Sequence, residues 1–287
     1  MTKDVLTVIQ EHMGTCSKGQ KRIAEFILNS YDKAAFMTAS RLGQTTDVSE
    51  STVVRFAAEL GYDGYPAMQK ALQEMIRNKL TAMQRIEISD DRMGEHNILP
   101  MVMHSDAENI RVTLEHIDHS SFYGAVRAIL AARRVYIIGV RSAYALAVFM
   151  GFYFNMMFEN VMVVASNSSS EVFEQILRIG EGDVMVGISF PRYSKRTLKA
   201  MRYATDRGAT VVAITDSEAS PLTDIADHVL LAKSDIVSFA DSLVAPLSLV
   251  NALIVAVSKQ KRGEMEGTFG MLEQIWEEYE VYEKTQH

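Results

Sequence analysis

Hydrophobic positions are spaced differently in the two parts of the chain. Between residues 17 and 80 they recur every three or four residues, as at Ile23, Phe26 and Ile27, and this spacing predicts amphipathic helices. From Arg133 onward, short unbroken apolar runs alternate with longer helical patterns. Apolar strands separated by helices indicate a parallel sheet that is covered on both faces. We therefore expect an all-α unit followed by an α/β unit.

The all-α unit is predicted to contain several short helices packed closely together. Ser17 and Gln20 fit a capping box that opens the first of them. Further helices are expected at 38–42, 49–60 and 65–76. Gly61 is a natural stop for the helix that precedes it.

The α/β unit is predicted to be a doubly wound sheet. Strands are expected at 135–138, 161–164, 184–188, 210–214 and 228–231. Helices are expected at 142–158, 169–179, 194–206 and 239–261. Five parallel strands with such helices suit the flavodoxin-like strand order 2-1-3-4-5.

Between these units the periodicity is lost, and the interruptions set the expected domain boundaries. The residues that break the pattern are Asp90, Asp91, Gly94, Asn97 and Pro100. We expect an all-α domain at 1–80, a linker at 81–105, the α/β domain at 106–262 and an acidic helix at 263–287. The last segment has an apolar stripe, which predicts a packing or interface face. The stripe consists of Leu272, Ile275, Trp276 and Tyr279.

Residues 38–60 have the pattern of a helix-turn-helix motif. The inward positions of the second helix are expected to be Val53, Phe56, Ala57 and Leu60. Asp47 stands where the tight turn usually has glycine, and Asp tolerates the left-handed conformation better than most residues. Ser49 is the expected N-cap of the second helix.

Hydroxyl and guanidinium groups face outward on that second helix. Serine and threonine at a helix start, one turn before an arginine, are residue types that contact phosphates and base edges in a major groove. The predicted DNA-binding residues are Ser49, Ser51, Thr52 and Arg55. The alternative is a plain helical bundle that serves protein interaction.

Charge favours DNA binding by the all-α unit alone. The whole chain has a net charge of −7, but residues 1–85 hold 11 Lys and Arg against 9 Asp and Glu. A mildly basic unit on an acidic body suggests that only the basic unit meets a polyanion.

Two serine-bearing turns follow the first and third predicted strands. The carboxyl ends of adjacent parallel strands meet at the switch point of a doubly wound sheet, where helix N-termini attract anions. The predicted ligand-binding residues are Gly139, Arg141, Ser142, Ser189, Arg192 and Ser194. They suit one phosphate monoester rather than a nucleotide, because the chain has neither Gly-x-Gly-x-x-Gly nor Gly-x-x-x-x-Gly-Lys-Ser/Thr. Alternatively, the serines only cap helices.

The all-α unit resembles the helix-turn-helix domain of the RpiR family of bacterial regulators. The motifs are Ala39-Ser-Arg-Leu42, Val48-Ser-Glu-Ser-Thr-Val-Val-Arg-Phe56 and Leu60-Gly-Tyr-x-Gly-Tyr65. This resemblance covers most of residues 1–80 and implies operator binding by dimers.

The body resembles the SIS (sugar isomerase) domain over about residues 105–260. Gly139-x-Arg141-Ser142 resembles its Gly-x-Gly-x-Ser turn with Arg141 in place of the second glycine. Residues 189–194 resemble its Ser-x-Ser-Gly-x-Thr turn with Pro191 and Arg192 as departures. The resemblance implies phosphosugar binding by Ser142, Ser189 and Ser194. The two arginines either bind the ligand or crowd it, and their charge raises the hypothesis of a ligand with an extra carboxylate.

Other kinds of chemistry find little support in the sequence. Glu171 and His228 are the best candidates for an isomerase base, but they more simply begin a helix and a strand. His96, His104, His116 and His119 lack a further ligand at metal-binding spacing, so neither a metal nor another cofactor is expected. Two stretches, 142–158 and 242–258, contain no charged residue over 17 residues each. We expect them to be buried helices beside a sheet rather than membrane-spanning helices.

We therefore expect a cytoplasmic transcription regulator rather than an enzyme. Its expected partners are operator DNA, a phosphorylated sugar or derivative that switches DNA affinity, and further copies of itself in a homodimer or homotetramer. We expect that ligand binding relieves repression. The alternatives are a sugar-phosphate isomerase with an accessory helical domain, and an interaction protein with a degenerate site.

Overall fold

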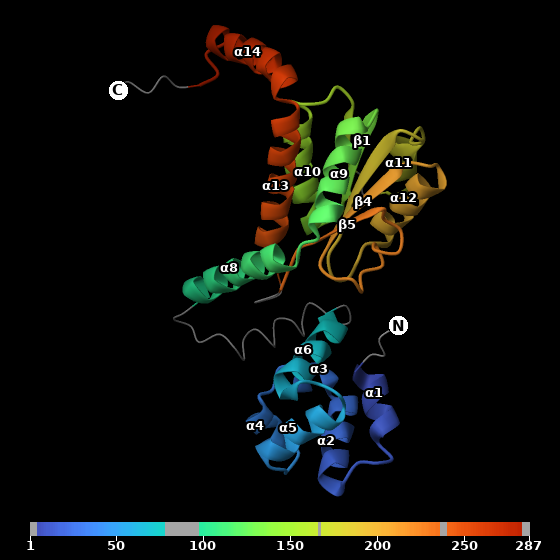
Figure 1. Ribbon diagram of the computed structural model, residues 1–287, viewed down its shortest axis with the longest axis vertical. Coiled ribbons are helices and arrows are strands. Elements are labelled where there is room, and N and C mark those ends of the chain that lie inside the picture. The colour runs from blue at the N-terminus through green and yellow to red at the C-terminus, as the bar shows by residue number, and fades with distance from the viewer. Residues whose placement is uncertain (1–4, 78–97, 166–167, 236–239, 283–287) are drawn as a thin grey trace. The chain divides into compact units, whose positions relative to one another are not determined.

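The computed structural model describes residues 5–77, 98–165, 168–235 and 240–282. The chain divides into two compact units, Met1–Ile98 and Leu99–His287 (Figure 1). Most of the segment predicted to be a linker, 81–105, lies outside the described residues, and its last part, 98–105, forms the first turns of a helix. The domain boundaries therefore stay a prediction.

The first unit is all-α. Its helices are α1 (Val5–His12), α2 (Lys18–Asn29), α3 (Tyr31–Ala34), α4 (Ala39–Thr45), α5 (Glu50–Glu59) and α6 (Gly64–Arg77). The predicted capping box is confirmed, because Ser17 accepts from the Gln20 amide and the Gln20 side chain accepts from the Ser17 amide. The helices α1 and α3 were not predicted. The unit closes around large buried side chains, among them Ile23, Ile27, Leu42, Phe56, Met68 and Leu72.

The second unit begins with α8 (Ile98–His116) and α9 (His119–Ala131) and continues into a parallel sheet. The strands are β1 (Arg134–Gly139), β2 (Val161–Val164), β3 (Asp183–Ile188), β4 (Thr210–Thr215) and β5 (His228–Leu231). The later helices are α10 (Ser142–Phe154), α11 (Ser169–Ile176), α12 (Lys195–Asp206), α13 (Val244–Gln260) and α14 (Arg262–Glu278). The sheet order is β2-β1-β3-β4-β5, which confirms the predicted doubly wound fold.

Each face of this sheet has its own hydrophobic core. Ile137, Val186 and Val212 pack with the helices α9, α10 and α13. Their strand neighbours, such as Tyr136 and Met185, point to the other face and pack with α11 and α12. Figure 1 shows these two helical layers on either side of the strands. The unbroken apolar strands are thus explained, since consecutive residues enter opposite cores.

An ion pair between an exposed arginine and a buried carboxylate joins the amino ends of β1 and β3. The Asp183 side chain is fully buried and accepts from the Nε and Nη2 atoms of Arg133, each at 2.9 Å, and from the Gly180 amide at 3.0 Å. A buried carboxylate is tolerated when such donors satisfy it. The pair therefore holds the two strands whose far ends carry the predicted ligand site.

The uncharged stretches fold mainly as α10 and α13, which pack side by side on one face of the sheet. No helix among the described residues is long and apolar enough to cross a membrane.

Candidate functional site

The turns after β1 and β3 leave the sheet next to each other. Gly139 pairs with Ile188 across the two strands, so the residues that follow, Val140 and Ser189, lie at the same edge. The chain winds from β1 outward to β2 on one side and to β3 on the other, which makes this edge the switch point of the sheet. The predicted juxtaposition of the two turns is therefore present.

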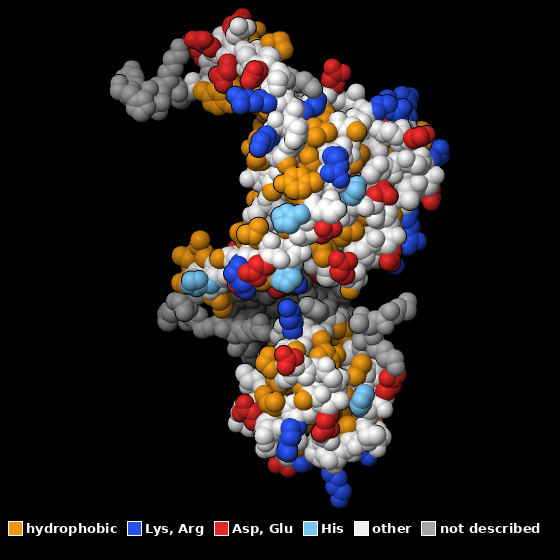
Figure 2. All heavy atoms as spheres, in the orientation of Figure 1, with side chains coloured by type: hydrophobic (Ala, Val, Ile, Leu, Met, Phe, Trp, Pro, Cys, Tyr) orange, Lys and Arg blue, Asp and Glu red, His pale blue; other side chains and the backbone are white. Residues whose placement is uncertain are grey.

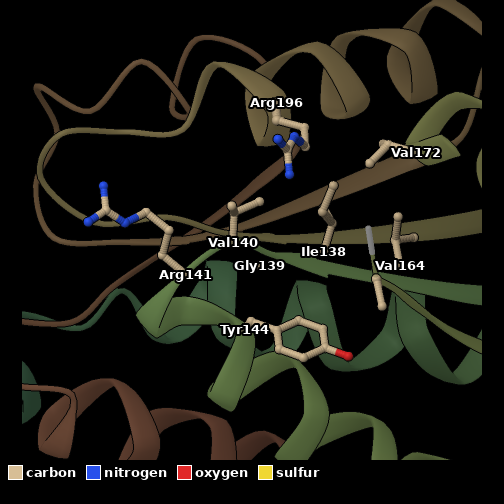
Figure 3. Close-up of a pocket in the computed structure, with 9 residues that line it drawn as sticks. Ile138, Gly139, Val140, Arg141, Tyr144, Val164, Val172 and Arg196 are labelled. Carbon is tan, nitrogen blue, oxygen red and sulfur yellow. The ribbon is translucent and has the colours of Figure 1, made fainter. Parts of the chain in front are cut away.

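A pocket of about 410 Å³ opens beside the β1 turn (Figure 3). This volume lies within the range of about 300–1,000 Å³ that is typical of small-molecule sites. Its lining residues are Ile138, Gly139, Val140, Arg141, Tyr144, Val164, Ala165, Val172 and Arg196. Of the predicted ligand residues, Gly139 and Arg141 line the pocket, whereas the other four are not among its lining residues.

Sequence reasoning missed Arg196 and Tyr144. Arg196 lies in the first turn of α12, two residues after the predicted Ser194, and Tyr144 lies in the first turn of α10. Both helix starts were expected at the site, so a search of the first helical turns would have found them.

The start of α10 approaches the end of β1 very closely. A Cβ atom on Gly139 would collide with the carbonyl group of Ala143, so a side chain at this position would push the helix away. Ser142 is the exposed first residue of α10, and Ala143 is buried. Counted from Gly139, the serine of the Gly-x-Gly-x-Ser pattern falls on Ala143 rather than on Ser142.

Both arginines that replace glycines have positive φ angles. Arg141 has φ 61° and ψ −127°, and Arg192 has φ 66°. Such a backbone costs a residue with a side chain about 1–3 kcal/mol, and strain of this kind concentrates at functional sites. The turns therefore keep a glycine-like backbone while they carry a guanidinium group.

The hydroxyl groups of Ser189 and Ser194 accept hydrogen bonds from backbone amides of their own turn and of the helix that follows. The Ser189 Oγ accepts from the Ser194 amide at 3.0 Å, and the Ser194 Oγ accepts from the Arg196 and Thr197 amides at 3.2 and 3.3 Å. Ser194 is thus the N-cap of α12, as the alternative to ligand binding supposed. Arg192 is exposed on the same turn.

The end of β4 braces this turn. The Tyr193 hydroxyl donates to Asp216 Oδ1 at 2.8 Å, and the Thr215 Oγ1 lies 2.8 Å from the Ser189 carbonyl oxygen. Burial, followed by the charge of Asp216, raises the pKa of Tyr193 to about 12. These partners are more than twenty residues apart in the chain, so no local pattern indicated them.

The helix-turn-helix is formed by α4 and α5. A Cβ atom on Gly43 would lie 2.8 Å from the Val48 carbonyl oxygen, so the two helices meet where only glycine fits. Asp47 has φ 53°, which confirms the left-handed turn without glycine. Val53, Phe56, Ala57 and Leu60 are all buried, as predicted.

The exposed start of α5 carries a cluster of hydroxyl groups. The Ser49 Oγ lies 2.9 Å from the Ser51 Oγ and 2.8 Å from the Thr52 Oγ1. Ser49 occupies the N-cap position but makes no side-chain cap, which corrects the predicted capping bond: the neighbouring hydroxyls hold its oxygen instead. The Arg55 Nε donates to the Ser51 carbonyl oxygen at 3.3 Å and keeps the guanidinium on this face.

The residues considered for catalysis do not meet in the pocket. Glu171 lies in the first turn of α11, and the His228 ring packs against Gly124 of α9. Within the described ranges, no three His, Cys, Asp or Glu side chains gather in a way that could hold a metal ion. His96 lies outside the described residues.

The first unit contains a helix-turn-helix, and the second is a doubly wound sheet with an arginine-lined pocket at its switch point. These features define a class of DNA-binding regulators in which one chain carries both the DNA-binding motif and the ligand pocket. The family model "Helix-turn-helix domain, rpiR family" matches residues 3–79, and the model "SIS domain" matches residues 128–256. The chain belongs to the RpiR family of helix-turn-helix transcriptional regulators, with a SIS domain as its second unit.

Known relatives agree with this assignment. The chain is 29% identical to an HTH-type transcriptional regulator of Haemophilus influenzae over 79% of either chain. Among solved structures, it is similar to the sugar isomerase domain of an RpiR transcription factor from Sphaerobacter thermophilus, with 28% identity and a TM-score of 0.60 over 62% of this chain and 99% of that one. The NanR protein of Vibrio vulnificus, solved with ManNAc-6P, shares the fold over 95% of this chain and 97% of its own, at 21% identity and a TM-score of 0.58.

Proposed function

We propose that a phosphorylated sugar or sugar derivative binds in the SIS domain and switches the affinity of this regulator for its operator. The observation that carries the proposal is the pocket at the switch point, which two arginines line. None of its lining residues, all within the described chain, is acidic. An anionic ligand therefore finds favourable charge and the dipole of α10 there. The ligand in the NanR structure indicates which compounds to test first.

The proposed site spans both turns. It contains the six residues predicted from the sequence, namely Gly139, Arg141, Ser142, Ser189, Arg192 and Ser194, and extends to Arg196 and Tyr144. The proposed DNA-binding residues are Ser49, Ser51, Thr52 and Arg55. We place this activity in the cytoplasm, where a regulator of bacterial genes meets both DNA and phosphorylated metabolites.

A dimer would couple the ligand site of the second unit to the DNA-binding residues of the first. Tyr144, Val148 and Phe152 are exposed and lie four residues apart, on one face of α10. The neighbouring α13 exposes Val244, Leu247 and Val255, and Figure 2 shows hydrophobic side chains over this part of the second unit. An uncharged apolar face of this kind suits a second copy of the chain. The exposed stripe formed by Met271 and Ile275 of α14 and by Tyr279 at its C-cap offers a further surface for a tetramer.

Ligand would act by favouring one arrangement of the dimer. A ligand shifts an equilibrium only if it binds one state better than the other. Half-site spacing follows from dimer geometry, so a small movement at this interface would misplace the two recognition helices. Tyr144 belongs both to the pocket lining and to the exposed stripe, and it therefore gives the ligand a direct route to the interface. We propose that ligand relieves repression.

An isomerase is the competing function. Moving a proton between sugar carbons requires a general base close to the substrate, usually Glu or His. The described lining residues include neither. The pocket therefore favours binding without turnover.

Thermal unfolding with a panel of sugar phosphates, each paired with its unphosphorylated sugar, tests the ligand. A compound at about 100 times its Kd adds about 2.7 kcal/mol, which raises the Tm by several degrees. The expected result is a shift by at least one phosphorylated compound and none by its parent sugar. Shifts by neither class would overturn the proposal. Conversion of a bound compound to its isomer, detected by NMR, would favour the isomerase.

A further inference from the structure

We propose that Lys18 and Lys21 of α2 bind the phosphate backbone of the operator, at the edge of the groove that α5 enters. The inference rests on the proposed DNA contacts of α5 and adds the element that supplies positive charge beside them. It is independent of the ligand that binds in the second unit.

The helix α5 carries too little positive charge to hold DNA by itself. Its charged residues are Glu50, Arg55 and Glu59, and all three are exposed. About half to two-thirds of the hydrogen bonds between proteins and DNA go to phosphate and sugar, and neutralisation of phosphates supplies much of the affinity. A neighbouring element must therefore provide cations.

The helix α2 has the largest excess of basic residues among the described helices of the first unit. Lys18, Lys21 and Arg22 stand against Glu25, and all three basic residues are exposed. Their spacing of three and four residues places them on one side of the helix. Because the Arg22 guanidinium binds Asp47, we assign Lys18 and Lys21 to the DNA backbone.

The first turn of α2 packs against the start of α5 (Figure 1). A Cβ atom on Gly19 would lie 3.3 Å from the Val48 Cγ1 and 3.8 Å from the Thr52 Cγ2. Lys18 directly precedes this contact, and Thr52 is one of the proposed DNA-binding residues. The amino end of α2 is therefore held beside the face of α5 that we assign to DNA.

A hydrogen-bonded side chain fixes this arrangement. The Gln20 Nε2 donates to the Glu59 Oε2 at 2.6 Å, and the Gln20 Oε1 accepts from the Ser17 amide at 2.8 Å. Gln20 thus ties the amino end of α2 to the last turn of α5. A helix end that is fixed before binding lowers the entropy cost of forming contacts.

A helix that lies beside α5 does not fit into the same groove. The major groove of B-DNA is about 12 Å wide, and one helix with its side chains is about 10–12 Å across. The amino end of α2 therefore lies over the sugar-phosphate backbone when α5 is in the groove. Lysine suits this position, because its ammonium group is a compact charge on a flexible four-carbon stem.

Phosphate contacts give the two lysines a role that differs from that of Arg55. Such contacts position a protein on any duplex and carry no sequence information, whereas contacts to base edges specify the sequence. Loss of a lysine should therefore weaken binding to all duplexes alike.

Fluorescence anisotropy of the full chain tests the inference with two duplexes of equal length. One is a duplex that the wild-type protein selects from a random library, and the other has the same bases in scrambled order. Lys18→Gln and Lys21→Gln should each weaken binding to both duplexes by a similar factor, at least about threefold at low salt, and should each lower the salt slope by about one. The double variant should lower the slope by about two and select the same sequence as wild type.

Two further variants are the controls. Lys18→Arg keeps the charge and should keep the wild-type salt slope. Lys33→Gln removes the same charge from an exposed position in α3, which follows the other end of α2. The twelve residues of α2 span about 18 Å, so Lys33 should leave affinity and slope unchanged. Thermal unfolding of each variant verifies that the fold is intact.

The outcomes separate this inference from the proposal on which it rests. Unchanged affinity and slope in the double variant, together with weaker binding by Arg55→Ala, would overturn the inference alone. If Arg55→Ala had no effect either, the proposed DNA contacts of α5 would be wrong as well. Weaker binding of the lysine variants to the selected duplex only would show that the lysines read bases, and would contradict a phosphate contact.

Discussion

Arg22 of α2 holds Asp47 at the corner of the helix-turn-helix. Its Nη1 lies 2.7 Å from the Asp47 Oδ2, and its Nη2 donates to the Asp47 carbonyl oxygen, also at 2.7 Å. The two side chains are 49% and 95% exposed, so the ion pair contributes about 0–1 kcal/mol. The bond to the carbonyl matters more for geometry, because it fixes the turn residue with the positive φ angle.

The first prediction separates backbone strain from the ion pair at this turn. Asp47→Ala loses the pair and leaves Ala at φ 53°, so it should destabilise the protein by about 1 kcal/mol. Asp47→Gly loses the same pair but adopts this φ without strain, and should stay within about 0.5 kcal/mol of wild type. Scanning calorimetry of both variants measures the difference. Equal Tm values would mean that the φ angle does not limit stability here.

The second prediction concerns DNA. Arg55→Ala should weaken binding to a duplex that the wild-type protein selects from a random library, by at least about tenfold, because it removes the Arg55 guanidinium from the hydroxyl-rich face. Fluorescence anisotropy at several salt concentrations checks this. A phosphate contact would also lower the salt slope by about one. Arg178→Ala, in the second unit, is the control, and an unchanged affinity and slope for Arg55→Ala would place the recognition surface elsewhere.

The third prediction concerns the strain at the β1 turn. Arg141→Gly should raise the stability of the ligand-free protein by about 1 kcal/mol, because glycine adopts φ 61°, ψ −127° without a clash. Arg141→Ala removes the same charge and keeps the strain, so its Tm should stay near that of wild type. If both variants gained equally, charge repulsion rather than the backbone would be the cause.

The fourth prediction is a pH dependence. The raised pKa of Tyr193, about 12, means that the folded state keeps this proton more tightly than the unfolded chain, whose tyrosines titrate near 10. The stability from this group is complete below pH 10 and is lost as the pH rises from 10 toward 12. Tyr193→Phe should therefore lose less stability over that range than wild type. Absorbance at 295 nm against pH should also lack one late-titrating tyrosine in the variant.

Tyr65 gives the matched comparison. Burial raises its pKa to about 12 as well, and its hydroxyl donates to the Met37 carbonyl oxygen at 2.7 Å in the first unit. Tyr65→Phe should reduce the late titration equally while leaving the second unit untouched. A titration of Tyr193 near pH 10 would contradict the buried bond to Asp216.

Local patterns were sufficient for most of the fold. The capping box at Ser17, the inward row from Val53 to Leu60 and the unbroken apolar strands each follow from periodicities of a few residues. Such periodicities are properties of neighbouring residues and can be read without tertiary contacts. The short helix α3 was missed, because its four residues are too few to show a period.

The sequence by itself therefore determined the strands of the doubly wound sheet, the helices between them, and the meeting of two turns at its switch point. Only the tertiary structure decided which side chains line the pocket. Arg196 and Tyr144 line it from the first turns of α12 and α10, whereas the Ser194 hydroxyl caps its own helix. Helix direction depends on close approaches such as Gly139 against Ala143 and on braces such as Tyr193 with Asp216. The spacing of residues along the chain does not predict such tertiary contacts.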